Sequence, residues 1–315
     1  MGPPLAYLIV IAVWATTPLA IKISSEYYAP LTAAAMRFAL ASLIACSLVA
    51  LFHGGSGLKR RHWKAYAIAS LSIFPNMPLV YSATAYISSG LISVILATSP
   101  FVMGLLSIVI LKSNPFTPLR LLGLGIALAG LTLIVGRQIS LGGDAWIGVL
   151  LMFASTLVFS LSNVLLKQLD THAIDPLEQS LGAMTFALPG LVLCFVLSEQ
   201  SVPPLVMNQS AWAIAYLAGV GSILGYMAFY YVLRTMPFEL VGLVPLITPA
   251  LAMTLGVVVA GELVSDSLKH GSLLILLGLA VYELLPPLMQ KWRRRSIVVG
   301  PCAGSAQNQQ AAADH

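Results

Sequence analysis

Ten long apolar runs, separated by short segments rich in charge, Pro and Gly, constrain this chain more than any other feature. A run of about 20 apolar residues matches the thickness of a bilayer's hydrocarbon core. Only 9% of the 315 residues are charged, against about 25% in a soluble domain. Lipid offers the backbone no hydrogen-bond partner, so each run is predicted to be a helix. The runs cover roughly residues 4–22, 30–52, 64–87, 89–111, 118–136, 145–166, 177–198, 211–233, 240–261 and 271–290.

This pattern predicts an all-α polytopic membrane protein with ten transmembrane helices. The apolar runs exclude a soluble globular protein and a disordered chain. A disulfide scaffold is also excluded, because three cysteines in 315 residues are too few for a disulfide framework. The first run has no basic segment before it and no cleavage site after it, so we expect it to be retained as a span.

The distribution of Lys and Arg over the loops predicts the orientation of these helices. Arg37 lies inside a run, and the loops on one side carry only Lys22, Arg137 and Lys269. Cytoplasmic loops carry the excess of basic residues, so both termini are predicted to be cytoplasmic, in a chain of the cell inner (plasma) membrane. The loops on the other side carry twelve basic residues: Lys59, Arg60, Arg61, Lys64, Lys112, Arg120, Lys167, Arg234, Lys291, Arg293, Arg294 and Arg295.

An internal repeat relates the two halves of the chain. Residues 36–46 read MRFALASLIAC and residues 184–194 read MTFALPGLVLC, with six of eleven positions identical at an offset of 148. Each half holds five runs, an odd number, so the second half is predicted to enter the membrane the opposite way round, as in many secondary transporters. We therefore expect a first five-helix repeat at 1–137, a second at 138–290, and a basic, disordered cytoplasmic tail at 291–315.

Several stretches resemble the EamA-type branch of the drug/metabolite transporter superfamily. They read WATTPLAIK from Trp14, PLTAAAMRFALASL from Pro30, YSATAYISSGLISVILATSP from Tyr81, and Gly261–Glu262 after the ninth run. One departure is Lys112–Ser113, where the family often repeats Gly-Glu in the first half.

The resemblance covers about residues 5–290 and implies two five-helix bundles around a central cavity. It further implies alternating access for small metabolites, often amino acids or related compounds, usually moved outward. From the first of these stretches we place Trp14 and Thr17 among the substrate-binding residues.

Helix-interrupting residues occur at corresponding points of the two halves. In the third run Asn76 lies between Pro75 and Pro78, and each proline removes a helical N–H. Matched interruptions often surround a transporter's binding site, although proline can simply kink a helix and glycine can simply allow close packing. The matching stretch of the eighth run contains Gly219, Gly221 and Gly225.

The fourth and ninth runs carry a second matched pair, Ser99–Pro100 and Thr248–Pro249. Proline frees a backbone carbonyl, and the adjacent hydroxyl group can bond either that carbonyl or a ligand. We predict that Asn76, Ser99 and Thr248 bind substrate. Helix breaks or hinges are predicted at Pro75, Pro78, Pro100, Gly221, Gly225, Pro245 and Pro249.

Five tyrosines cluster in the third and eighth runs. Tyr81, Tyr226 and Tyr230 are predicted to line the cavity, since an aromatic ring offers apolar area with a polar tip to a small organic solute. Tyr86 and Tyr231 stand near run ends and fit an interfacial belt.

Arg37 is the only strongly basic residue well inside a run, at about 10 Å from its start for a rise of about 1.5 Å per residue. Two hypotheses remain open. Arg37 binds a substrate carboxylate, or it forms a structural ion pair at the face shared with Lys22, with Glu26 or Glu262 as the partner.

The sequence carries no HExxH, GxSxG or metal-ligand spacing, so we expect neither an enzyme nor a bound metal or cofactor. Basic residues gather at helix ends, which argues against a nucleic-acid partner. The expected partners are a small-molecule substrate and the bilayer, with coupling to a proton or counter-solute left open and a monomer as the default state. We predict a secondary, non-ATP transporter of a small metabolite, with export favoured. The alternatives are a multidrug or cation exporter of the same architecture and a membrane receptor or sensor bundle.

Overall fold

The computed structural model describes residues 2–52, 58–140, 143–169, 171, 174–198, 204, 206–236, 244–262 and 265–298. Within these ranges the chain is helical and has no strand. The helices are α1 (Pro3–Ser24), α2 (Pro30–Phe52), η1 (Arg60–His62), α3 (Trp63–Ser70), α4 (Asn76–Ala83), α5 (Ser89–Leu96), α6 (Ser99–Ile110), α7 (Pro118–Ser140), α8 (Ala145–Leu166), α9 (Pro176–Leu197), α10 (Gln209–Tyr216), the π-helix η2 (Leu217–Leu224), α11 (Gly225–Thr235), α13 (Val244–Ala260) and α14 (Asp266–Val298).

Seven helical stretches in the described part of the chain are long and apolar enough to cross a membrane. Two shorter apolar helices cover Pro118–Ile134 and Ile247–Ala260. The run predicted at 64–87 is divided between α3 and α4, with turns between them. The prediction of a helical membrane protein is confirmed, and the count of ten spans stays a prediction.

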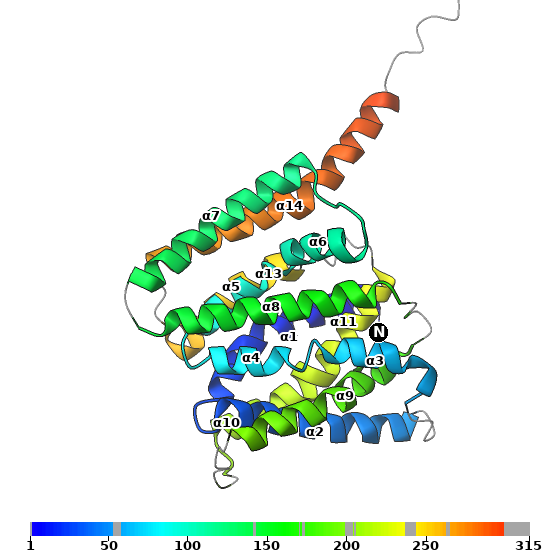
Figure 1. Cartoon of the computed structure of the whole chain (residues 1–315), viewed down its shortest axis with the longest axis vertical. Coiled ribbons are helices and arrows are strands. Elements are labelled where there is room, and N and C mark those ends of the chain that lie inside the picture. Colours follow the sequence, from blue (N-terminus) through cyan, green and yellow to red (C-terminus); the bar gives the residue numbers. More distant parts are fainter. Residues whose placement is uncertain are drawn as a thin grey trace, which may run out of the picture.

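The helices lie side by side across the bundle (Figure 1), with α7 and α14 stacked on one flank and α2 and α9 on the other. Glycine allows the α7–α14 pair to approach closely, because a Cβ atom on Gly123 would stand 2.5 Å from the Gly278 carbonyl oxygen. Helix α14 continues through the basic residues to Val298 and projects from the bundle. The helix is therefore longer than the span predicted at 271–290, and residues 299–315 of the predicted tail lie outside the described residues.

The two larger of the apolar cores in the described part of the chain each combine helices of both halves. One is built from α1, α2, α3, α9 and α11. The other is built from α1, α4, α5, α8 and α10. The halves therefore interleave instead of packing as two separate bundles, and any cavity at the centre has walls from both.

Candidate functional site

A cavity of about 110 Å³ lies among helices of both halves. Most of its wall is apolar or aromatic with a few polar groups, the usual character of a small-molecule site. The lining residues are Trp14, Thr17, Pro18, Ile21, Arg37, Asn76, Met77, Val80, Ile92, Ser93, Leu96, Ala97, Ser99, Phe159, Gly221, Tyr226, Pro245 and Thr248.

The structure brings most of the predicted substrate-binding residues to this wall, namely Trp14, Thr17, Arg37, Asn76, Ser99, Tyr226 and Thr248. It places two others elsewhere. Tyr81 is fully buried in an apolar core, and its hydroxyl group has no hydrogen-bond partner among the described residues. Tyr230 packs in the other core, with its ring centroid 6.1 Å from that of Tyr226.

Sequence reasoning missed several residues of the wall. Ile21 follows Thr17 by one helical turn, so the face of α1 that carries Trp14 and Thr17 already implied it. Phe159 carried no such signal. It reaches the site because its ring lies 6.1 Å from that of Trp14, which also contacts Phe229 at 4.8 Å.

The interruption between α3 and α4 is held by side chains. The Asn76 Nδ2 atom donates to the Ser72 carbonyl oxygen at 2.8 Å, and the Tyr226 hydroxyl group donates to the same oxygen at 3.3 Å. The Ser155 hydroxyl group donates to Asn76 Oδ1 at 2.6 Å. Asn76 therefore lies at the wall with its amide engaged by the protein, which favours a role in shaping the site.

The predicted hinge residues fall at several kinds of position. Pro75 precedes α4, and Pro78 and Pro100 occupy the first turns of α4 and α6, where a missing N–H removes no helical bond. Pro245 lies in the first turn of α13 and lines the cavity. Helix α13 continues through Pro249, so no break occurs there.

The eighth run contains a π-helix where its glycines predicted an interruption. η2 covers Leu217–Leu224 and continues directly into α11, so the segment stays helical. Gly221 lines the cavity. A Cβ atom on Gly225 would lie 3.0 Å from the Val13 Cγ1 atom, so this glycine lets α11 pack against α1. π-helical turns occur often at functional sites.

A polar contact between the halves lies just beyond the cavity end marked by Ile21 and Ile92. Lys22 Nζ stands 2.8 Å from Glu262 Oε1. The backbone N–H of Ser89, in the first turn of α5, donates to the same carboxylate at 3.0 Å, and the Ser89 hydroxyl group donates to Oε2 at 2.9 Å. The α5 N-terminus adds its positive dipole end to the site. Of the two acids considered for this face, Glu262 is the one that pairs with Lys22.

The backbone after α13 aims Glu262 at these partners. Gly261 has a φ of +60°, in the left-handed region that glycine adopts without penalty. The Glu262 N–H then bonds the Gly256 carbonyl oxygen at 3.0 Å, which ends the helix and turns the side chain back. Burial raises the pKa of the Glu262 carboxyl group, but the hydrogen bonds from Lys22 and Ser89 outweigh burial, and the pKa lies below its usual value.

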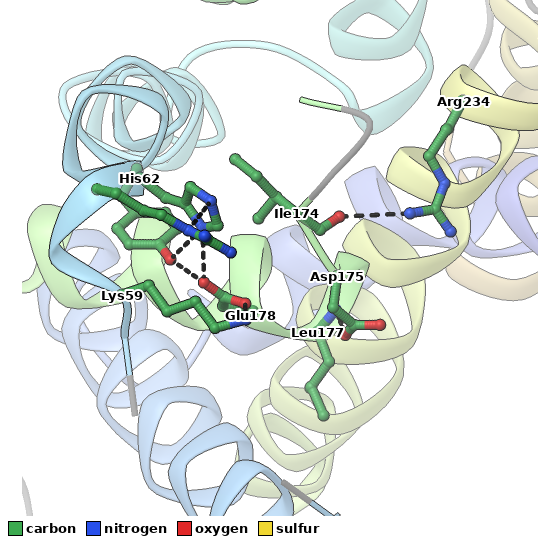
Figure 2. Close-up of polar contacts among 9 residues, drawn as sticks. Lys59, His62, Ile174, Asp175, Leu177, Glu178 and Arg234 are labelled. Carbon is green, nitrogen blue, oxygen red and sulfur yellow. Dashed lines mark hydrogen bonds and ion pairs between the residues drawn. The ribbon is translucent and has the colours of Figure 1, made fainter. Parts of the chain in front are cut away.

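A second polar contact between the halves lies at the opposite end of the bundle, where α3 and α9 begin (Figure 1). Glu178 of α9 is 5% exposed. It accepts hydrogen bonds from the Tyr66 hydroxyl group and from His62 Nδ1, the latter at 2.9 Å, and pairs with Lys59 at 3.3 Å. Figure 2 shows Lys59 and His62 converging on this carboxylate. Arg61 Nε donates to His62 Nε2 at 3.0 Å, so Nδ1 carries the proton given to Glu178.

Close packing supports this second contact. A Cβ atom on Gly182, one turn after Glu178, would lie 2.3 Å from the Tyr66 ring. Two turns further along α9, a Cβ atom on Gly190 would lie 2.4 Å from the Phe74 ring. Aromatic rings of the first half thus fill glycine notches of α9. Nearby, Arg234 Nη1 donates to the Ile174 carbonyl oxygen at 3.4 Å, which Figure 2 also shows.

A polytopic helical bundle with a central cavity walled by both halves is typical of membrane transport proteins. The comparison with protein families agrees. The model of the EamA-like transporter family matches residues 3–136 and 146–283. The chain belongs to this family, within the drug/metabolite transporter superfamily, and is a transporter.

The chain is similar to named transporters at low sequence identity. The chain is 24% identical over 258 residues to the uncharacterized inner membrane transporter YedA of Escherichia coli (strain K12). The match covers 80% of this chain and 81% of that protein. The chain is 25% identical over 291 residues to a probable amino-acid metabolite efflux pump of Salmonella typhimurium, covering 87% and 92%. A solved crystal structure shares the fold with a TM-score of 0.66 at 21% identity, over 91% of this chain and 98% of that one.

Proposed function

We propose that this transporter moves a small organic solute, such as an amino acid or a related metabolite, by alternating access through the central cavity. The observation that carries the proposal is the position of the cavity between two polar contacts, Glu262 with Lys22 and Glu178 with His62, at opposite ends of the bundle. Each contact joins one half of the chain to the other. Opening either end requires its contact to break while the other holds, and this is the geometry that alternating access needs.

We further propose ten spans arranged as two inverted repeats. The family match in two successive segments supports a duplicated chain. So do the ends of α6 and α13. Lys112 has a φ of +51°, and the Ser113 N–H bonds the Ser107 carbonyl oxygen at 3.2 Å. Gly261 and Glu262 repeat this turn 149 positions later, with a φ of +60° and a bond of 3.0 Å.

The same comparison explains the Lys112–Ser113 departure from Gly-Glu. Lys112 adopts the left-handed conformation that Gly261 adopts in the second half, so the turn survives without glycine. Ser113 stands where Glu262 stands, so this end of the first half has no matching carboxylate. The two repeats therefore share backbone geometry and differ in charge.

The character of the wall supports an organic solute that is not a cation. Trp14, Phe159 and Tyr226 supply aromatic area, and Arg37 is the one charged residue among the described residues of the lining. A multidrug cation exporter needs a carboxylate in its cavity, and the described lining residues include none. Export of an amino acid fits the name of the Salmonella typhimurium relative, a probable amino-acid metabolite efflux pump. The proposed protein is a secondary transporter that acts as a monomer and couples transport to a proton or a counter-solute.

Flux measurement tests the function directly. Purified protein in liposomes should move amino acids, and Trp14→Ala and Tyr226→Ala should each lower the rate about tenfold or more, because each removes aromatic area from the wall. Trp212→Ala is the matched control, since Trp212 is 63% exposed and outside the cavity. Wild-type rates in both cavity variants would place the pathway elsewhere. Specific binding without any flux would support a receptor or sensor.

The proposed orientation places both termini in the cytoplasm of the inner (plasma) membrane. The N-terminus and the projecting end of α14 lie at the same end of the bundle (Figure 1), and the Lys and Arg excess lies on that side. An impermeant thiol reagent should therefore label Cys302 only after cell lysis. Labelling of Cys302 in intact cells would show that the orientation is the opposite of the one proposed.

A further inference from the structure

Arg37 is a buried cation whose charge meets no carboxylate among the described residues. It is 1% exposed, lies in α2 and lines the cavity. Neither acid considered for a structural pair reaches it, since Glu262 binds Lys22 and Ser89, and Glu26 is exposed. The Arg37 Nη1 atom has no hydrogen-bond partner in the described part of the chain.

The guanidinium group is nevertheless held in place. Its Nε atom donates to the Ser222 hydroxyl group at 2.9 Å, and Ser222 belongs to the π-helix of the other half. Its carbon lies 4.8 Å from the centroid of the Phe38 ring. A Cβ atom on Gly221 would stand 3.4 Å from Nη2, so glycine at this position leaves the head group room at the wall. One edge of the group is thus anchored by protein, and the Nη1 side stays unsatisfied.

A buried charge without a partner is costly in a low-dielectric environment. The protein supplies one neutral hydrogen bond and one aromatic face, and neither neutralises the charge. A planar guanidinium group is well suited to a carboxylate, which can take two parallel hydrogen bonds. An anionic group entering the cavity would supply both the missing bond and the missing charge.

We propose that Arg37 binds the carboxylate of the transported solute, so that the substrate class is a small carboxylate with an apolar body. This inference rests on the proposed function and names the substrate class of the same cavity. The apolar body lies against Trp14, Phe159 and Tyr226. The described lining has no acidic side chain for an ammonium group, so recognition depends on the carboxylate and accepts amino acids and deaminated acids alike.

Matched probes test the proposal on the intact wild-type protein. We choose L-leucine, its deaminated analogue 4-methylpentanoate, and 4-methylpentanamide, which has the same shape as that acid without its charge. Binding is measured by isothermal calorimetry in detergent and flux in liposomes. Charge-assisted hydrogen bonds contribute more than neutral ones, so we expect the Kd of the amide to exceed that of the acid by about tenfold or more. Equal Kd values for the acid and the amide would overturn the proposal.

Variants then assign the effect to Arg37. Arg37→Gln should bind the acid and the amide equally, and Arg37→Lys should recover little of the difference, because a point charge does not reproduce the planar fork. Lys269→Gln is the control, since Lys269 is exposed and paired with Asp266 outside the cavity. If Arg37→Gln fails to fold, the comparison of acid and amide binding in wild-type protein and in Arg37→Lys still tests the proposal.

Failure of the inference is separable from failure of the proposed function. Flux of neutral or cationic solutes, with no binding of either carboxylate probe, would overturn the carboxylate class and leave the transporter in place. Arg37-dependent binding of 4-methylpentanoate without flux would support the site and contradict transport of that acid. Full acid selectivity in Arg37→Gln would show that another group binds the carboxylate.

Discussion

Replacing Glu262 by Gln should weaken the contact that closes one end of the cavity. The carboxylate accepts three hydrogen bonds, from Lys22 Nζ and from the backbone and hydroxyl groups of Ser89. A hydrogen bond to a charged group contributes about 1.5–3 kcal/mol and a neutral one about 0.5–1.5, so loss of the charge removes about 1 kcal/mol from each. The Lys22 side chain is 32% exposed, and solvent screening lowers its share.

The total loss is therefore about 1–3 kcal/mol, which falls on the conformation closed at this end. Such a change shifts a two-state equilibrium by roughly 5–150-fold. The open state should become correspondingly more populated in Glu262→Gln, while the contact at Glu178 is untouched.

Thiol accessibility measures this shift. Ser93 lines the cavity and is 5% exposed, so Ser93→Cys, in a chain without its natural cysteines, reports on the cavity. An impermeant maleimide is applied to intact cells and to inside-out vesicles. Glu262→Gln should raise the labelling rate from one side only, by about the factor estimated above. Glu26→Gln is the matched control at the same end, because Glu26 is exposed. Labelling that stays at the wild-type rate from both sides would refute a closing role for Glu262.

Three further results are expected. The pKa of Glu262 lies below its ordinary value of 4.5, so its contribution to stability is complete above about pH 4.5 and is lost as the pH falls through the lower folded-state pKa. The Tm of wild-type protein should therefore fall more steeply in acid than the Tm of Glu262→Gln, and parallel curves of Tm against pH would contradict this. Gly182→Val should lower the Tm and the yield of folded protein, because its side chain would overlap the Tyr66 ring; an unchanged Tm would show that α3 and α9 can separate freely. Asn76→Leu should destabilise the fold by about 1–3 kcal/mol, because the Ser155 hydroxyl group loses its hydrogen-bond acceptor. Unchanged thermal stability with altered flux would instead support a role of Asn76 in substrate binding.

The membrane class and the family were accessible from the sequence because their signals are local. The composition of each apolar run determines its transfer free energy into lipid, and proline within a run indicates an interrupted helix. The turn before α4 was predicted in this way from Pro75. Most polar residues chosen for the cavity do line it, because a polar side chain inside an apolar run has few other places to lie.

The tertiary structure alone decided which faces meet and which charges pair. Tyr81 and Tyr226 are alike in the sequence, but only Tyr226 reaches the cavity, because the rotation of each helix depends on its neighbours. Lys22 and Glu262 are 240 residues apart, and local patterning could not choose between Glu262 and Glu26 as the partner. Glu178 drew no attention in the sequence, since one acid near a predicted helix start is ordinary. Its role depends on Tyr66 and His62 arriving from the other half, and such long-range pairing is set only when the whole bundle packs.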